Sequence, residues 1–393
     1  MSDATAGASS QSFARRVARE VFVQRTAQAG MLWIGVLAVI AVFAPFIATS
    51  HPLLLSENGS VSSPALRHLN TADWTLLFIF FAIIASLFIK LPWRIKLAGL
   101  AIGTAAVAAF SAVTVQPPQL VIYDQYRQKA MTNGYDWVVF APIPFSPKDY
   151  LRDQGDTSLQ APLTDERFRH WFGTEENGAD VLSRMIHASR IALGIGFVAT
   201  GIAMIIGVIL GGLMGYFSGW VDMLGMRLVE IFESIPTLFL LLTFVAFFGR
   251  SLYLMMVIIG LTSWPGYARY VRAEFLRLRQ QDFVQAAVVQ GLPLHSILFR
   301  HILPNGVAPI LVAASFGVAS AILAEATLSF LGLGLVDDPS WGQMLNQAVK
   351  ASSFNWWMAM FPGGAIFLTV FAYNMIGESL RDAIDPYLKK SSG

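Results

Sequence analysis

Residues 191–215 read IALGIGFVATGIAMIIGVILGGLMG, a run without a single charged side chain. A helix that crosses the hydrocarbon core of a bilayer needs about 20 largely apolar residues, so this run is long enough to do so. Further long, largely apolar runs occur at 31–49, 74–89, 97–115, 228–249, 251–268, 305–334 and 356–377. The sequence therefore predicts an all-α, polytopic membrane protein with about eight spans.

The composition of the 393-residue chain agrees with a membrane protein and excludes several other classes. Hydrophobic residues make up 55% of the chain and charged residues 13%, whereas soluble domains average about 25% charged residues. Lys and Arg number 27 against 25 Asp and Glu, so no basic face for nucleic acid is expected. Because the chain contains no cysteine, disulfides, thiolate catalysis and cysteine-based metal sites are excluded.

Lysine and arginine residues predict which loops face the cytoplasm, because short cytoplasmic loops are enriched in both. With eight spans, four basic segments fall on one side of the membrane: the N-terminus, the loop after 74–89, the loop 269–304 and the C-terminal tail. We therefore expect both termini to be cytoplasmic. A re-entrant hairpin over 74–115 is the alternative to two spans there, and it leaves the other loops on the same sides.

This topology divides the chain into five segments. They are a cytoplasmic, amphipathic N-terminal segment (1–30), a first span with an inserted hairpin (31–115), a proline-rich extracytoplasmic cap segment (116–187), a membrane core that includes the cytoplasmic loop (188–380) and a cytoplasmic tail (381–393). The N-terminal segment is either a helix at the membrane interface or a frayed basic tail. The cap segment is either a small cap or an extended loop.

The cytoplasmic loop 269–304 has the pattern of two short helices separated by a turn. Asp282 is a good N-cap for the first helix, and Gly291 suits the left-handed position that ends it. Pro293 can open the second helix, and Pro304 marks re-entry into the membrane. On these residues alone, the loop is either a built surface for a partner or an ordinary connection between helices.

Two adjacent alanines, Ala286 and Ala287, lie in the first of these short helices. Small side chains make a low surface that a groove on a partner can receive closely, whereas bulkier side chains would hold the two surfaces apart. We therefore expect both alanines to be presented to the cytoplasm.

The loop resembles the motif of binding-protein-dependent ABC importer permeases, commonly written EAA-x3-G-x9-I-x-L-P. The spacing from the first alanine to the proline is kept, and the chain departs from the motif where Gln stands for Glu and His for Ile. The ending His-Ile-Leu-Pro-Asn is similar to the dipeptide/oligopeptide/nickel branch of the family. The matching positions are Gln285, Ala286, Ala287, Gly291, His301, Ile302, Leu303, Pro304 and Asn305.

Other stretches resemble the same branch, namely 172–184, 215–237 and 325–334. Residues 133–145 are similar, in a weaker way, to microcin C-type peptide permeases. The resemblance implies a permease core of six helices, to which the hairpin at 74–115 is an addition.

The resemblance also implies a role and a set of partners. The chain would form half of a translocation pathway in the bacterial inner membrane, beside a second homologous permease subunit. Two cytoplasmic ATP-binding subunits would drive it, and an extracytoplasmic substrate-binding protein would deliver the cargo. A peptide is the expected substrate, with nickel chelates, opines and short glycans left open. The residues implied at the ATPase contact are Asp282, Gln285, Ala286, Ala287 and Gly291, and those implied at re-entry are His301, Leu303, Pro304 and Asn305.

No nucleotide, cofactor, metal or catalytic site is expected within the chain itself. A phosphate-binding P-loop needs a glycine directly before its lysine, and no lysine here follows a glycine. The six histidines are scattered and form no recognisable ligand motif. Energy for transport would therefore come from another subunit or from an ion gradient.

Four residues within the apolar runs remain to be interpreted. Gly207, Gly211 and Gly215 recur at a spacing of four, which favours close packing of two helices in a membrane. Glu325 is an acid within an apolar run, where it must face protein or water. It is interpreted either as a pathway or gating residue or as a hydrogen-bonding group at a helix kink. A self-sufficient secondary transporter or channel that uses Glu325 is the alternative function.

Overall fold

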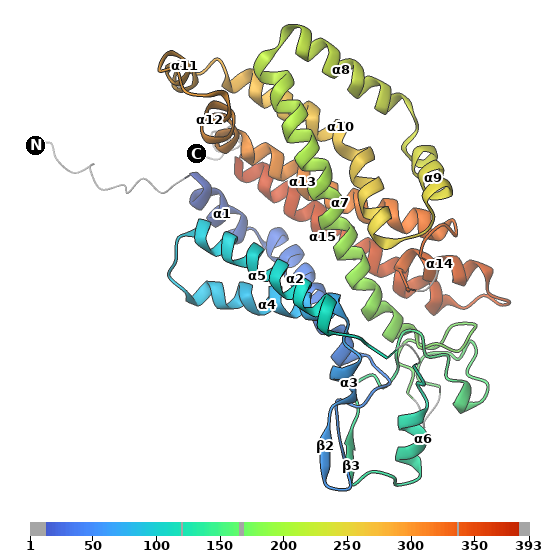
Figure 1. Ribbon diagram of the computed structural model, residues 1–393. Coiled ribbons are helices and arrows are strands. Elements are labelled where there is room, and N and C mark those ends of the chain that lie inside the picture. Colours follow the sequence, from blue (N-terminus) through green and yellow to red (C-terminus); the bar gives the residue numbers. More distant parts are fainter. Residues whose placement is uncertain (1–12, 119–120, 165–168, 336–337, 385–393) are drawn as a thin grey trace, which may run out of the picture. The chain divides into compact units, whose positions relative to one another are not determined.

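The computed structural model describes residues 13–118, 121–164, 169–335 and 338–384, and within them it is built almost wholly of helices (Figure 1). The helices are α1 (Phe13–Val23), α2 (Arg25–Ile47), α3 (Pro64–Arg67), α4 (Thr71–Phe88), α5 (Trp93–Thr114), α6 (Gln125–Met131), α7 (Val181–Phe217), α8 (Gly219–Ser234), α9 (Thr237–Phe248), α10 (Leu252–Leu278), α11 (Asp282–Val289), α12 (Leu294–Ser296), α13 (Leu303–Phe330), α14 (Trp341–Lys350) and α15 (Trp356–Ile384). The strands are β1 (Leu54–Glu57), β2 (Ser60–Ser62) and β3 (Trp137–Val139).

The helices confirm an all-α, polytopic membrane protein. Among the described residues, six helical stretches are long and apolar enough to cross a membrane, and they include α2, α4, α5, α7, α13 and α15. The pair α8 and α9, bent by 80°, makes a seventh if it forms one span. The remaining predicted run, 251–268, coincides with Ser251 and the first part of α10, which is not among these candidate spans although its 27 residues give a length of about 40 Å.

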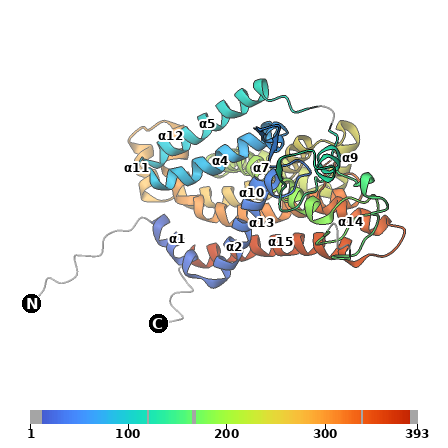
Figure 2. The ribbon, with the colours of Figure 1, turned by 90° about the horizontal axis from the view of Figure 1, so that it is seen from below.

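The chain forms two compact units. Within the described part, the first comprises 13–35, Leu193–Leu328 and 365–384, and the second comprises Val36–Ala192 and Ser329–Gly364. In the first unit, α11 and α12 lie together at one end of α10 and α13 (Figures 1 and 2). The first unit therefore holds the whole of the predicted cytoplasmic loop.

The N-terminal helix α1 packs against the end of α15 within the first unit. Val17 and Val21 are buried in a cluster with Ala383 near the end of α15, and Leu380 and Ile384 border this cluster. This packing argues against a frayed tail. An additional contact with the membrane interface remains a prediction for the rest of this helix.

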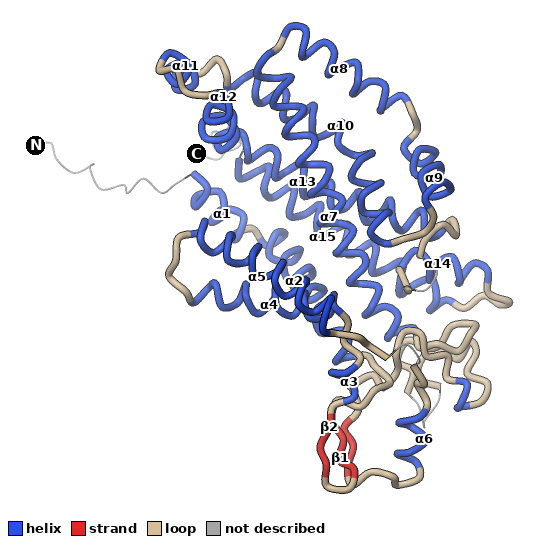
Figure 3. Tube along the Cα trace, viewed as in Figure 1, coloured by secondary structure: helices blue, strands red, loops and turns tan. Residues whose placement is uncertain are grey.

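In the second unit, a small sheet is assembled from two distant parts of the chain (Figure 3, red). Strand β1 pairs antiparallel with its neighbour β2 and also with β3, giving the order β2-β1-β3. Leu54 lies opposite Val139, and Ser56 lies opposite Trp137. The described residues of the predicted cap segment 116–187 are therefore folded together with the segment between α2 and α4. The sequence analysis did not single out that second segment.

A buried ion cluster holds this sheet-containing module together. The Arg127 guanidinium lies 2.5 Å from a carboxylate oxygen of Asp149 and 2.7 Å from one of Asp153. The Ser50 hydroxyl donates to the same Asp149 carboxylate at 2.5 Å. Although burial opposes the charge, these carboxylates raise the pKa of Arg127, so the guanidinium stays protonated.

The inserted hairpin consists of α4 and α5, joined by a short turn and running side by side (Figures 1 and 2). Asn70 and Asp73 form a reciprocal capping box at the start of α4. The Asp73 carboxylate also lies 2.6 Å from the Arg190 guanidinium of α7. With 18 and 22 residues, α4 and α5 are about 27 and 33 Å long. The length of α5 is enough to cross a hydrocarbon core of about 30 Å, and α4 is about 3 Å shorter than this core, a difference that slight thinning of the bilayer accommodates.

A further helix, α14, lies between the last two predicted spans and was not anticipated from the sequence. The Ser340 hydroxyl caps its start by accepting a hydrogen bond from the Gln343 N–H at 3.2 Å. The Trp341 indole N–H donates to the Met185 carbonyl of α7 at 3.2 Å. At only ten residues, α14 is too short to be found by a search for long apolar runs.

Candidate functional site

The short helix α11 ends as its sequence predicts. Gly291 has a φ of +70°, in the left-handed region that glycine adopts without steric cost. The Leu292 N–H donates to the Ala287 carbonyl at 3.2 Å, and the Gly291 N–H donates to the Val288 carbonyl at 2.9 Å. This pair of hydrogen bonds is a Schellman motif, which fixes the end of α11 and turns the chain toward α12.

The predicted capping role of Asp282 is wrong. The residue in the N-cap position is Gln281, and no side chain accepts a capping hydrogen bond there. Asp282 is instead the first residue of the helix, where its exposed carboxylate complements the positive end of the helix dipole. Its charge therefore stays available on the surface.

The two alanines of the motif differ in exposure, which corrects the expectation that both are presented to the cytoplasm. Ala286 is exposed, but Ala287 is only 3% exposed and belongs to a core cluster with Val271 and Phe275 of α10. Its small side chain lets α11 lie close to the membrane helices. The outward face of α11 carries Ala286 together with Val289, which is 86% exposed.

Gln285 connects α11 to the end of the preceding helix. Its side-chain amide donates to the Arg279 carbonyl oxygen at 2.8 Å. The Arg279 guanidinium in turn donates to the Tyr216 carbonyl oxygen at the end of α7, at 2.9 Å. A glutamate, which is usual at this position of the motif, has no proton to give to a carbonyl oxygen when it is ionised.

The re-entry residues lie within one nearly continuous helical stretch rather than at a break. After α12, the chain forms a π-helical turn, Ile297–Ile302, that leads directly into α13. The Leu303 N–H reaches the Leu298 carbonyl, five residues back. Pro304 has no N–H to donate, and a widened turn is one way in which a helix accommodates that loss.

The remaining motif residues follow this turn. The Asn305 side-chain amide donates to the His301 carbonyl at 2.7 Å, which links the start of α13 to the π-helical turn. Pro304 and Asn305 are exposed, and Leu303 and His301 are partly exposed. The structure therefore brings the re-entry residues and α11 to the same end of the first unit.

The three spaced glycines lie where α7 packs against α10. A Cβ added at Gly211 would overlap the Ala268 carbonyl oxygen and lie 2.9 Å from the Val271 Cβ. A Cβ at Gly215 would lie 2.6 Å from the Arg272 carbonyl oxygen, and one at Gly207 would overlap Tyr267. The backbones of the two helices are in contact along this row, which is the arrangement that small residues permit in membranes.

Glu325 lies within α13 and is 2% exposed, so it faces protein rather than lipid. The nearby Thr327 hydroxyl donates to the Leu323 carbonyl of its own helix at 2.7 Å.

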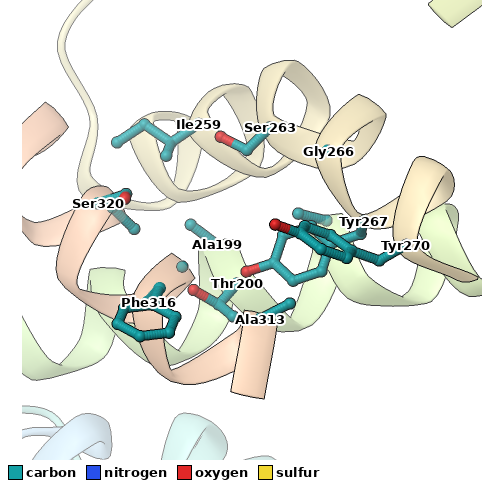
Figure 4. A pocket seen from close by; sticks show the side chains of 13 residues that line it. Ala199, Thr200, Ile259, Ser263, Gly266, Tyr267, Tyr270, Ala313, Phe316 and Ser320 are labelled. Atoms are coloured by element: carbon teal, nitrogen blue, oxygen red, sulfur yellow. The ribbon is translucent and has the colours of Figure 1, made fainter. Parts of the chain in front are cut away.

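A cavity of about 240 Å³ lies among α7, α10 and α13, and sequence reasoning did not find it (Figure 4). Its lining is small, apolar or hydroxyl-bearing and contains no charged side chain. The lining residues are Ala199, Thr200, Ala203, Ile259, Ser263, Gly266, Tyr267, Tyr270, Ala313, Phe316, Gly317, Ser320 and Ala321. Over the described ranges, no group of three or more His, Asp or Glu side chains could hold a metal ion.

The sequence of the chain matches a known family over its C-terminal half. Residues 207–390 fit the profile of the family described as "Binding-protein-dependent transport system inner membrane component". The chain is also 39% identical over 252 residues to the dipeptide transport system permease protein DppC of Alkalihalophilus pseudofirmus, covering 64% of this chain and 81% of that protein. The chain belongs to this family. The resemblance found in the loop motif is thereby confirmed.

Two other relatives of this inner membrane component have similar coverage. The oligopeptide transport system permease protein OppC of Haemophilus influenzae is 41% identical over 248 residues, covering 63% of this chain and 78% of that protein. The glutathione transport system permease protein GsiD of Pectobacterium atrosepticum is 40% identical over 221 residues, covering 56% of this chain and 73% of that protein. The permease is thus a multi-pass inner membrane protein with more than a third of its chain outside these matches.

Proposed function

We propose that this permease is a transport subunit of an ATP-driven, binding-protein-dependent importer of peptides. The observation that carries the proposal is its 39% identity to a dipeptide permease over 81% of that protein's length. The chain itself is not an enzyme in this proposal. It forms half of the pathway with a second permease, and two ATP-binding subunits and an extracytoplasmic binding protein complete the importer.

Coupling to the ATPase takes place at the outward face of α11. Asp282, Gln285 and Ala286 are exposed there and form the contact, together with the apolar side chain of Val289. Ala287 and Gly291 hold this face in position. Ala287 packs on α10, and Gly291 ends the helix. A push on α11 would reach the membrane helices through the buried contacts of Ala287 and through the hydrogen bond from Gln285.

The proposal places the termini and the 269–304 loop in the cytoplasm and the sheet-containing module outside. The module then lies on the side from which a loaded binding protein approaches. Its role at that docking step rests on position alone.

The substitution Ala286→Arg tests the docking surface. In the assembled importer, a long charged side chain on the outward face should hold the ATPase groove away, so we expect binding-protein-stimulated ATP hydrolysis to fall by about tenfold or more. The matched control is Ala273→Arg, because Ala273 is exposed on α10 and lies outside α11.

Equal stimulation in Ala286→Arg and in the unsubstituted importer would remove α11 from the coupling path. Uptake driven by a proton gradient alone, without the ATP-binding subunits, would instead favour a secondary transporter that uses Glu325. Ala287→Arg is a poorer test, since it would disrupt the packing of the helix itself.

A further inference from the structure

The cavity among α7, α10 and α13 contains polar groups that the protein itself does not satisfy. Thr200 and Tyr267 are 6% and 7% exposed, and both line the cavity. The two hydroxyls lie beside each other, and neither has a hydrogen-bond partner of normal geometry among the described residues. Because a buried polar group without a partner costs about 1–3 kcal/mol, such a pair points to an occupant that supplies the missing hydrogen bonds.

The position of the Tyr267 hydroxyl is fixed by the opposite helix. A Cβ added at Gly317 of α13 would overlap the hydroxyl group of Tyr267. The Tyr267 hydroxyl therefore occupies space at residue 317 that any side chain larger than that of glycine would fill. Figure 4 shows the side chains of α7, α10 and α13 converging on this space, with Phe316 on the α13 side.

The cavity is accessible along one side. Ser263, Gly266 and Tyr270 follow one another on an exposed stripe of α10, and Ser320 is exposed on α13. All of these residues lie near the middle of their helices, and α7 and α13 are long enough to span. An occupant would therefore be held at about mid-depth of the bilayer and could enter from the exposed stripe.

The lining restricts the chemistry of the occupant. It offers hydroxyl groups and small apolar surface but no charge to pair with, so a charged group would lose its hydration without compensation. The volume of about 240 Å³ exceeds the roughly 10–15 Å³ needed for one water molecule many times over. A short, uncharged stretch of peptide, with amide groups that both donate and accept, fits these conditions.

We propose that this cavity is a transient binding site for an uncharged peptide segment in transit, in which Thr200 and Tyr267 hydrogen-bond its amide groups. The inference rests on the proposed function, because it names where this chain contacts the peptide that the importer carries. It assigns Thr200 and Tyr267 as binding residues for which the family motif gives no sign.

The test uses the complete importer in proteoliposomes, with labelled tri-alanine as the probe and ATP-dependent uptake as the readout. Tyr267→Phe and Thr200→Val each remove one hydroxyl and keep the side-chain shape. We expect each to lower tri-alanine uptake about three- to tenfold, the fold-change that corresponds to one hydrogen bond. A matched control is Tyr373→Phe, since the Tyr373 hydroxyl is also buried without a partner but lies outside the cavity.

The outcomes separate the two proposals. Import by the unsubstituted complex, together with equal uptake by Tyr267→Phe, Thr200→Val and Tyr373→Phe, would overturn the binding site and leave the importer function standing. Failure of an ATPase-active complex to import any alanine peptide of two to five residues would overturn the peptide-import function, and with it the peptide as occupant. If Tyr267→Phe does not assemble, Thr200→Val decides.

Discussion

The side chain of Gln285 shows how a single residue can have two duties. Its amide hydrogen bond to the Arg279 carbonyl joins α11 to the end of α10, and its position on the exposed side of α11 places it at the proposed ATPase contact. The motif predicted the second duty. The first could not be predicted, because it depends on where the backbone of residue 279 lies after folding.

Another residue with an unusual setting is His51, in the sheet-containing module. Its ring stacks on that of His68 with 3.7 Å between centroids, and its Nδ1 is buried without a partner among the described residues. Burial first, and then the neighbouring His68, lower the pKa of His51 to about 4. The folded module therefore holds this imidazole neutral at pH values where the unfolded chain would protonate it.

This setting predicts that the module loses stability in acid. Between the unfolded pKa of about 6.5 and the folded pKa of about 4, the unfolded state binds more protons, so the free energy of unfolding falls as pH falls. We expect a loss of up to about 3 kcal/mol, present below pH 4 and absent above pH 6.5. Thermal unfolding of the purified chain between pH 7.5 and 4.5 measures it.

His51→Phe should reduce that pH dependence, because the ring can still stack but cannot titrate. The exposed residue His295 supplies the control, and His295→Phe should leave the dependence unchanged. An unaltered slope in His51→Phe would show that other groups cause the acid sensitivity.

At the scale of elements, the α7–α10 interface depends on contact between two backbones. Gly207, Gly211 and Gly215 line one face of α7, and residues 267–275 of α10 fill the space that side chains would otherwise take. Lipid provides no hydrophobic drive for this association, so close packing has to supply it. The spacing of the glycines was visible in the sequence, but the identity of the partner helix was not.

Gly211→Ala should destabilise the protein by about 1–3 kcal/mol, because the added methyl group would collide with the Ala268 carbonyl and Val271. Gly201→Ala lies on the same helix, where nothing is within 4 Å of the added atom. That substitution should be neutral or stabilise the protein by up to about 1 kcal/mol, since alanine favours a helix over glycine. Unfolding temperatures of the two variants in detergent check the difference, and equal values would contradict the packing argument.

The length of an element and the pattern of its apolar residues explain which elements could be predicted from sequence. Long apolar runs located most of the spanning helices, because about 20 residues are needed to cross a bilayer whatever the neighbours are. The burial of Ala287 was missed, since a short helix with apolar residues on several sides gives no clear inward face. The continuity of α12 with α13 was also missed, because Pro304 suggested a break and the π-helical turn removed the need for one.

At the scale of the whole molecule, the main departure from expectation is the sheet-containing module. Its strands are only three or four residues long, which is too short for an alternating apolar pattern to identify a strand, so sequence periodicity could not reveal a sheet. The cavity was equally invisible, since three helices contribute to it and their contacts are set by tertiary packing.

The topology itself makes a prediction for the whole chain. If α4 and α5 both span the membrane, the turn between them, with Lys90, lies on the cytoplasmic side. A single cysteine at Lys90→Cys should then react with an impermeant thiol reagent only after the membrane is opened. The background is clean because the chain has no cysteine, and Gly59→Cys, in the turn between β1 and β2, serves as the externally reactive control. Labelling at residue 90 in intact cells would refute two spans and the proposed orientation.

The pairing of β1 with β3 has a consequence for biogenesis. Leu54 of β1 is synthesised before its partner Val139 of β3, and the whole of α4 and α5 is synthesised between the two strands. During translation, the first strand pair would therefore stay an incomplete ribbon until the hairpin had been threaded into the bilayer and the third strand released. Closure of the sheet would then report that membrane insertion of the nascent chain had succeeded, and a chain with a mis-inserted hairpin would display an unfinished edge to quality-control proteases.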